Sequence, residues 1–318
     1  MSYKLQNLHN SSPGGGGAED AIGQISRGFT WRLLEFIKFS HTLFALPFAF
    51  ASAVLAVMAH NASGAPQFQS GFWWNRTLLI LAAMVCARTA AMTFNRLADW
   101  SLDQRNPRTV RRHRLIPRWA AMLVCVASSG LFILVCLGIN PLAFRLSPVA
   151  LGTIYVYSFT KRFTHFSHFF LGFALALSPL GAWVAVTGDL GSWVPWILAA
   201  VVVFWVAGFD MIYAIQDIEF DRREELYSLA AKLGPAATLE LARVMHAVMF
   251  LLLLVLGGAA GLRGVYYAGL ALIAAILVWE HRLALRNTPE AIQVAFFRAN
   301  ALISFVLMFS ILIESLRS

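Results

Sequence analysis

Charged residues are scarce in this chain of 318 residues. They make up 13% of the sequence, against 59% hydrophobic residues, and the mean hydropathy is +0.67. About a quarter of the residues in a typical soluble domain are charged, so the composition excludes that class. It predicts a protein whose chain lies largely inside a lipid bilayer.

Cysteine is also scarce, and the three cysteines, Cys86, Cys125 and Cys136, lie inside apolar stretches without a CxxC spacing. No cluster of histidines accompanies them, so the sequence offers no cysteine-based metal site. We interpret the thiols as small core residues. His165 and His168 have helical spacing, but without a nearby third ligand we interpret them as structural too.

The N-terminal segment lacks the features of a targeting signal or a phosphate-binding loop. Residues 1–28 contain serine, proline and a glycine run but no apolar core, which argues against a signal peptide. The run, Gly14 to Gly17, is not followed by Gly-Lys-Ser or Gly-Lys-Thr. We expect residues 1–28 to form a flexible cytoplasmic tail and residues 29–318 a transmembrane domain.

Apolar stretches long enough to cross a bilayer as helices recur along the rest of the chain. The start of the fourth is ambiguous because Ser147-Pro148 follows a short link through Asn140-Pro141, although the third and fourth would then form a tight hairpin. The pattern predicts an all-α protein with about nine transmembrane helices. The expected spans are 36–59, 77–98, 119–138, 143–159, 166–187, 193–215, 238–261, 264–281 and 292–314.

The distribution of basic residues predicts the orientation in the membrane. Most lysines and arginines follow the even-numbered spans, whereas the opposite loops hold only Arg76, Arg145 and Arg263. The positive-inside rule therefore places the N-terminus in the cytoplasm and the C-terminus on the opposite side of an inner (plasma) membrane. This distribution also explains the net charge of +9 better than nucleic-acid binding, because no soluble basic face is present.

Two acidic motifs stand at the cytoplasmic ends of the second and sixth spans. Residues four apart on a helix project from similar directions, so each motif would present a stripe of oxygen ligands. Facing carboxylates repel unless cations lie between them, and Mg²⁺ shared with a diphosphate satisfies that requirement. The motif residues are Asn95, Asp99 and Asp103 in the first, and Asp210, Asp217 and Asp221 in the second.

Basic residues accompany the acidic motifs. Arg88 lies two turns before Asn95 on the first stripe, inside the membrane, where an arginine should face a polar cavity and an anion. Neighbouring cytoplasmic loops supply Lys161, Arg162, Arg108 and Arg112. One acidic motif alone would be interpreted as a solvated helix end. Two motifs on the same side with a buried arginine favour a functional site.

These motifs resemble those of the UbiA superfamily of intramembrane aromatic prenyltransferases. The resemblance covers about residues 32–315. It rests on Arg88 through Asp103, on Asn106-Pro107-Arg108-Thr109, on Tyr157 through Arg162 and on the spacing of Asp210, Tyr213, Asp217 and Asp221. It implies helices around a central cavity, with Mg²⁺ bridging the aspartates and a polyprenyl diphosphate. The reaction implied is polyprenyl transfer to an aromatic acid, of the 4-hydroxybenzoate type, in ubiquinone or menaquinone biosynthesis.

The resemblance also assigns roles to residues. Asp210 and Tyr213 would shape the reacting centre together with Arg88, which would contact the diphosphate. The implied ligands of the metal-diphosphate are Asn95, Asp99, Asp103, Asp217 and Asp221. The basic residues expected to bind substrate are Lys161, Arg162, Arg108 and Arg112.

Departures from the family pattern bear on the acceptor. Arg96 stands where the first motif commonly has a second acid, and Lys38-Phe-Ser-His41 replaces the usual Arg-Leu-Asp segment. With Phe94-Asn95-Arg96 and Gly208-Phe-Asp210, these residues resemble a subgroup linked to the futalosine route, whose acceptor is 1,4-dihydroxy-6-naphthoate. Both acceptors stay open. Lys38 and His41 are candidate substrate-binding residues, or an interfacial lysine and a buried histidine.

Two other classes of membrane protein compete with this interpretation. In an ion transporter or channel, Arg88 and Asp210 would line a path, but such proteins commonly show inverted repeats and broken helices in paired halves, which we do not find in the sequence. An intramembrane aspartyl protease would carry a Gly-x-Gly-Asp segment, which the chain lacks.

Overall fold

The computed structural model describes residues 28–37, 45–63, 71–106, 108–110 and 115–317, which form helices and loops without a strand. Eight helical segments among them are long and apolar enough to cross a membrane. Helix α7, Pro141–Tyr157, runs alongside them as a ninth. The all-helical fold expected from the sequence is therefore confirmed, and the predicted tail before residue 28 lies outside the described residues.

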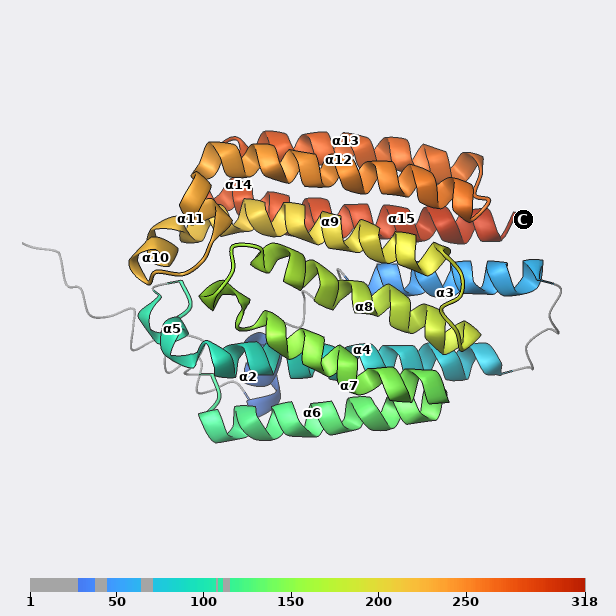
Figure 1. Ribbon diagram of the computed structural model, residues 1–318, viewed down its shortest axis with the longest axis horizontal. Helices are drawn as coiled ribbons and strands as arrows, with labels where there is room; N and C mark the ends of the chain where they lie inside the picture. The colour runs from blue at the N-terminus through green and yellow to red at the C-terminus, as the bar shows by residue number, and fades with distance from the viewer. Residues whose placement is uncertain (1–27, 38–44, 64–70, 107, 111–114, 318) are drawn as a thin grey trace, which may run out of the picture.

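The helices follow the predicted spans closely from the second onward (Figure 1). Asn140 separates α6 from α7: its side chain accepts a hydrogen bond from the Ala143 amide and Pro141 occupies the first turn, so the predicted hairpin starts cleanly. The long helices are α3 (Ala45–Ala62), α4 (Phe72–Ala98), α6 (Arg118–Ile139), α7, α8 (Ser167–Thr187), α9 (Val194–Ala214), α12 (Pro235–Ala259), α13 (Gly264–Ala284) and α15 (Asn300–Ser315).

The first span departs from its prediction. Residue 36, where the span was expected to begin, is the last residue of a separate short helix, α2 (Phe29–Phe36), and the membrane-length helix α3 is described from Ala45. The sequence from Ile37 to Phe44 mixes apolar residues with Lys38, Ser40, His41 and Thr42, so hydropathy does not mark where the helix begins. The last span is also composite, because α14 (Pro289–Val294) and a π-helical turn, η5 (Ala295–Ala299), lead into α15.

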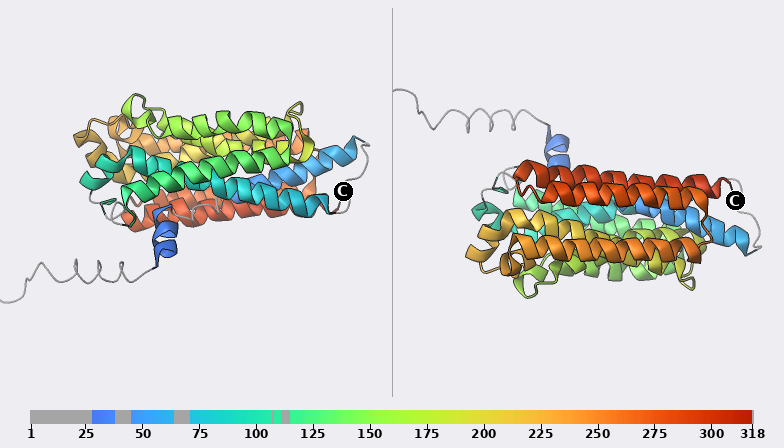
Figure 2. Two further views of the ribbon diagram at one scale, coloured as in Figure 1. Left: turned by 90° about the horizontal axis from the view of Figure 1, so that it is seen from below. Right: turned by 90° about the horizontal axis from the view of Figure 1, so that it is seen from above.

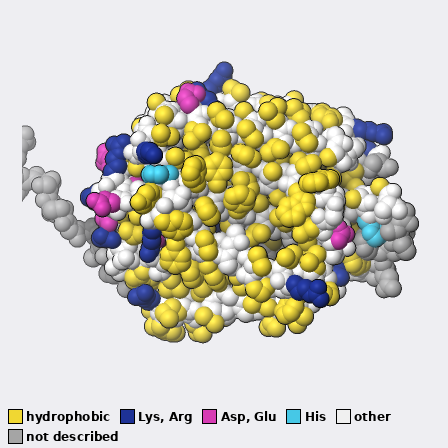
Figure 3. Space-filling view, viewed as in Figure 1, with side chains coloured by type: hydrophobic (Ala, Val, Ile, Leu, Met, Phe, Trp, Pro, Cys, Tyr) yellow, Lys and Arg dark blue, Asp and Glu magenta, His cyan; other side chains and the backbone are white. Residues whose placement is uncertain are grey.

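The long helices run roughly along one direction (Figure 2), and α9 lies between α8 and α12 in Figure 1 and packs against both. Most residues of α9 are buried, including Trp205 and Met211. The middle of the outer face in Figure 3 is largely hydrophobic, and charged side chains gather mainly towards its two ends. An apolar exterior of this length identifies an integral membrane protein.

Short helices gather at one end of the bundle. They are α5 (Trp100–Arg105), α10 (Ile218–Arg223) and α11 (Leu229–Leu233), and the chain ends at the opposite end (Figure 1). Both acidic motifs lie in this region. The predicted site residues of both motifs therefore lie at the same end of the bundle.

Candidate active site

A cavity of about 630 Å³ lies between the α4–α7 side of the bundle and helices α8 and α9. Polar side chains line its end near α5 and α10, and apolar residues such as Ile80, Phe132 and Leu175 line the rest. It brings together every predicted site residue that the structure describes. These are Arg88, Asn95, Asp99, Asp103, Arg108, Lys161, Arg162, Asp210, Tyr213, Asp217 and Asp221.

The two acidic motifs have matching backbone geometry. Asp99 and Asp217 each stand at a break between helices, directly before the six-residue helices α5 and α10. Asp103 and Asp221 are the fourth residues of those short helices. The predicted stripe along one straight helix is therefore wrong in detail: the helix is interrupted at Asp99 in the first motif and, after the turn η4 (Ile215–Asp217), at Asp217 in the second.

In the first motif, cationic side chains surround the acids. Arg96 lies 3.5 Å from Asp103, which is buried, and Arg162 lies 3.4 Å from Asp99 while donating to the Ala98 carbonyl at 2.6 Å. Burial raises the pKa of the Asp99 carboxyl, as does the Asp103 charge, and Lys161 and Arg162 oppose the shift. Both carboxylates line the cavity, Asp103 paired with Arg96 of its own motif and Asp99 with Arg162 of the neighbouring segment.

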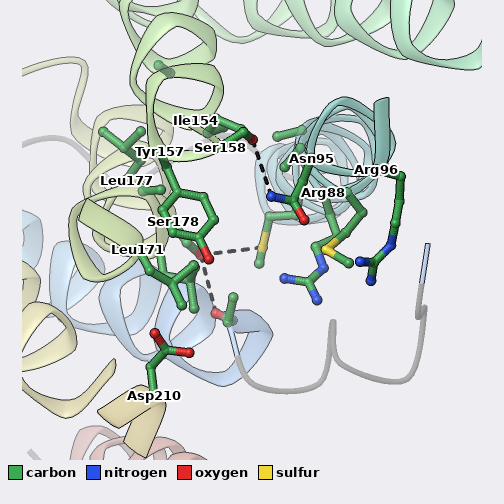
Figure 4. A pocket seen from close by; sticks show the side chains of 18 of the residues that line it. Arg88, Asn95, Arg96, Ile154, Tyr157, Ser158, Leu171, Leu177, Ser178 and Asp210 are labelled. Carbon is green, nitrogen blue, oxygen red and sulfur yellow. Dashed lines mark hydrogen bonds between the residues drawn. The ribbon is translucent and has the colours of Figure 1, made fainter. Parts of the chain in front are cut away.

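Arg96, a departure from the family pattern, has a structural role in this arrangement. Its guanidinium is buried and paired with Asp103 within the same motif. Asn95, one residue earlier, makes long contacts of 3.5 Å to Asp99 and to Ser158 of the neighbouring segment (Figure 4). Arg96, which stands where the family pattern commonly has an acid, therefore neutralises Asp103. It does not add a further carboxylate to the motif.

In the second motif, Lys161 provides the positive charge. It lies in a short turn, η3 (Thr160–Arg162), and its carbonyl accepts a hydrogen bond from the Tyr227 amide at 2.8 Å. Burial by itself lowers the pKa of Lys161, but the Asp221 and Asp210 carboxylates outweigh burial and raise it. The ammonium is thus held charged beside the buried Asp221.

Arg108 connects the two sides of the cavity. It comes from the loop after α5, yet its guanidinium donates to the Asp217 carboxylate and, at 3.2 Å, to the Tyr213 hydroxyl. Its charged end also lies 5.3 Å from the centre of the Tyr213 ring. Nearby, Arg105 pairs with Glu224 at 2.6 Å. Arg105 and Arg108, which follow Asp103 of the first motif, therefore contact acids in or next to the second motif.

Deeper in the cavity, Arg88, Tyr157 and Asp210 come from three different helices and project towards the same space (Figure 4). The Arg88 Nε atom is buried without a hydrogen-bond partner among the described residues. An unpartnered guanidinium nitrogen inside a membrane protein is costly, and an anion in the cavity would satisfy it. This supports the expectation that Arg88 faces a polar cavity.

His168 is a residue that the sequence interpretation set aside. It is 1% exposed in the first turn of α8, and its Nδ1 lies 2.6 Å from Asp210 Oδ2. The interpretation of His168 as an isolated structural histidine is therefore incomplete, because it contacts a cavity carboxylate. Its position shortly after Lys161-Arg162 in the sequence was the feature that could have indicated a place near the site. His165 instead packs edge-on against the Tyr227 ring.

Three predicted site residues, Lys38, His41 and Arg112, lie outside the described residues. Their assignment to substrate binding stays a prediction.

The acids fit Mg²⁺ only if other molecules share its coordination. Among the described residues, no three His, Cys, Asp or Glu side chains are arranged to hold a metal ion. Asp99 and Asp217 each offer a carboxylate to the cavity. Mg²⁺ commonly binds one or two carboxylates and fills its other positions with water and substrate phosphates, so this donor set suits a metal that arrives with a phosphate group.

Comparison with known proteins places this arrangement in a family. The chain is 32% identical over 234 residues to a 4-hydroxybenzoate octaprenyltransferase of Sodalis glossinidius, covering 72% of this chain and 79% of that protein. A similar enzyme of Vibrio campbellii is 28% identical over 244 residues, or 76% and 84% of the two chains.

Solved structures agree with this placement. The apo structure of a UbiA homolog from Aeropyrum pernix K1 has a TM-score of 0.75 and 31% identity, over 86% of this chain and 98% of that one. A UbiA homolog from Archaeoglobus fulgidus bound to GPP and Mg²⁺ shares the fold at 19% identity and a TM-score of 0.59, over 88% and 99%. Residues 45–302 match the model of the UbiA prenyltransferase family, and the chain therefore belongs to that family.

Proposed function

We propose that the protein transfers a polyprenyl group from a polyprenyl diphosphate to an aromatic acid and releases diphosphate. The observation that carries this proposal is the polarity of the cavity: most of its acids and bases converge at its end near α5 and α10, and most of the remaining lining is apolar. A prenyl diphosphate has the same two parts. The family membership and the names of the bacterial relatives support the same reaction.

The polar end would hold the diphosphate. Asp99 and Asp217 would hold Mg²⁺, with Asn95, Asp103 and Asp221 next to them at the same end of the cavity. Bound Mg²⁺ would stabilise the negative charge of the departing diphosphate. Lys161 and Arg88 would contact diphosphate oxygens directly, and Arg108 can turn from Asp217 to the same group once a cation neutralises that carboxylate.

The reaction would then proceed by charge separation. The bond between the allylic carbon and the diphosphate oxygen breaks, and the diphosphate leaves with the electron pair. The ring carbon next to the acceptor hydroxyl forms the new carbon–carbon bond, and the proton that it then loses passes to the released diphosphate. The apolar cavity wall excludes water, which would otherwise capture the allylic cation, and the face of Tyr213 can stabilise that cation.

The acceptor end would include Asp210 and His168. Asp210 lines the cavity one helical turn before Tyr213 on α9, and His168 holds one of its carboxylate oxygens. The remaining oxygen can accept a hydrogen bond from a ring hydroxyl. Both 4-hydroxybenzoate and 1,4-dihydroxy-6-naphthoate carry a ring hydroxyl and a carboxylate, so this chemistry accommodates either.

We further propose that the polar end faces the cytoplasm of an inner (plasma) membrane. The basic residues that the positive-inside rule counts, among them Arg105, Arg222 and Arg223, lie on the short helices and loops at this end. The C-terminus would lie on the other side.

An acceptor panel tests the proposal. Purified protein in lipid nanodiscs is incubated with Mg²⁺, a labelled polyprenyl diphosphate and either acceptor, and products are identified by mass spectrometry. We expect a prenylated aromatic acid from at least one of them, and the ratio of rates decides between the benzoate and the naphthoate. Absence of product from a broad panel would refute the enzyme assignment.

A further inference from the structure

Two buried polar residues lie on the helices behind the cavity wall. Glu280, near the end of α13, and Asn300, the first residue of α15, are both 0% exposed. Asn300 Nδ2 donates to Glu280 Oε1 at 3.0 Å. Burying an acid and an amide inside a helical bundle is unfavourable unless their hydrogen bonds are needed, and neither residue lines the cavity. The pair therefore requires an explanation other than substrate contact.

The Asn300 side chain holds an irregular turn. Directly before it lies the π-helical turn η5, whose wider ring disturbs the regular hydrogen bonds of an α-helix. Asn300 Nδ2 approaches two carbonyl oxygens of this turn, Phe296 at 3.0 Å and Ala295 at 3.3 Å. Glu280 fixes the amide from the opposite side. The pair thus stabilises the turn through side-chain hydrogen bonds that a regular helix would not need.

The π-helical turn carries Phe296, an aromatic side chain of the cavity wall. Phe296 lines the cavity, and its ring centre lies 4.4 Å from that of Tyr213 and 5.4 Å from that of Phe209. Tyr213 in turn contacts Arg108, and Asp210 precedes it by one turn on the same face of α9. If the π turn relaxed to an α-helix, the register would shift by one residue, and Phe296 would rotate by about 100° relative to α15.

We propose that Glu280 and Asn300 are a positioning pair that holds the π turn and thereby fixes Phe296 as the wall against which the aromatic acceptor is oriented. The proposal rests on the proposed prenyl transfer for its substrate. Phe296 would pack against the acceptor ring while Asp210 binds the hydroxyl, so the ring carbon to be alkylated faces the prenyl group. Glu280 and Asn300 act only through Phe296.

The test compares two buried carboxyl groups that join the same pair of helices. Glu280→Leu removes the oxygen that holds Asn300, whereas Glu280→Gln keeps an acceptor at that position. Glu314→Leu is the matched control: its Oε2 accepts from the Val265 and Tyr266 amides at 3.0 and 3.2 Å, at the far end of α13 and α15. Phe296→Ala and the double variant with Glu280→Leu complete the set.

We expect Glu280→Leu and Phe296→Ala each to lower kcat/KM for the acceptor by about tenfold to a hundredfold, because misplacement of about 1 Å can have effects of that size. KM for the prenyl diphosphate should not change. Glu280→Gln should restore the acceptor kinetics, and the double variant should be no worse than Phe296→Ala alone. Multiplied losses in the double variant, or an equal loss in Glu314→Leu, would overturn the proposal.

Hydrogen exchange of residues 295–300 provides a measurement independent of activity. Glu280→Leu should accelerate exchange in this segment, and Glu280→Gln and Glu314→Leu should not. Unchanged exchange in Glu280→Leu would refute the positioning role. A wild-type protein that transfers no prenyl group would refute the proposed function, and exchange would then still show whether Glu280 holds the turn that carries Phe296.

Discussion

His168 Nδ1 lies 2.6 Å from Asp210 Oδ2, a contact that joins the start of α8 to the cavity face of α9. The histidine is fully enclosed, whereas the Asp210 side chain is 19% exposed. Because one carboxylate oxygen is fixed by His168, the other is presented to the cavity in a defined direction. This contact connects a residue of the protein interior to the proposed acceptor end.

Replacement of His168 tests that contact. His168→Leu should lower kcat/KM for the aromatic acceptor by about tenfold to a hundredfold, because the Asp210 carboxylate loses the group that orients it. His168→Gln keeps a hydrogen-bond donor and should retain more activity. Steady-state kinetics with each substrate varied in turn provide the measurement. If the substitutions instead raised KM for the prenyl diphosphate, the assignment of His168 to the acceptor end would be contradicted.

The two aspartates at the helix breaks should be indispensable. Asp99→Asn and Asp217→Asn should each reduce turnover by at least about a hundredfold, because each removes a carboxylate that would bind Mg²⁺. Both variants should still be expressed and elute as monodisperse protein, since the bends at these residues do not use the carboxylate as a cap. Near-normal rates in either folded variant would show that the metal assignment is wrong.

Arg108 and Arg105 allow a matched comparison, because both connect one acidic segment to the other. Arg108→Gln should raise KM for the prenyl diphosphate about tenfold, since one charge-assisted hydrogen bond to that substrate is lost. Arg105→Gln should leave KM unchanged, because Arg105 contacts only the Ser101 carbonyl and Glu224 in the described hydrogen bonds and ion pairs. Equal effects of the two substitutions would assign Arg108 to stability instead of substrate binding.

Lys161 should remain charged throughout the working pH range. Asp221 and Asp210 raise its pKa above the ordinary lysine value, so protonation is complete below that value and is lost only at more alkaline pH. KM for the prenyl diphosphate should therefore stay flat between about pH 7 and about 9. Lys161→Met should raise it at every pH in that range. A rise of KM with pH in the wild type that Lys161→Met abolishes would contradict the assignment.

The sequence predicted the membrane helices well because their signal is local. Apolar stretches of spanning length, the hairpin at Asn140 and the positions of the acidic motifs are all readable along the chain. Hydropathy placed the start of the first span at the last residue of α2, however. It also could not show that the chain bends at Asp99 and Asp217, because an aspartate is compatible with either a helix or a helix break.

Contacts between distant segments could not be predicted from the sequence. The pairing of His168 with Asp210 and of Arg108 with Asp217 depends on how the helices pack, which no spacing rule specifies. Arg96 looked like the loss of a metal ligand, but the structure pairs it with Asp103. The π turn that carries Phe296 has no composition signal either, since its residues read as an ordinary apolar helix.

The most direct test of the central claim is the stoichiometry of transfer by the purified protein. With Mg²⁺, a polyprenyl diphosphate and 4-hydroxybenzoate or 1,4-dihydroxy-6-naphthoate, we predict one diphosphate released for each prenylated ring formed, and no product after chelation of the metal. Diphosphate release without a prenylated ring, or transfer that continues after chelation, would contradict the account.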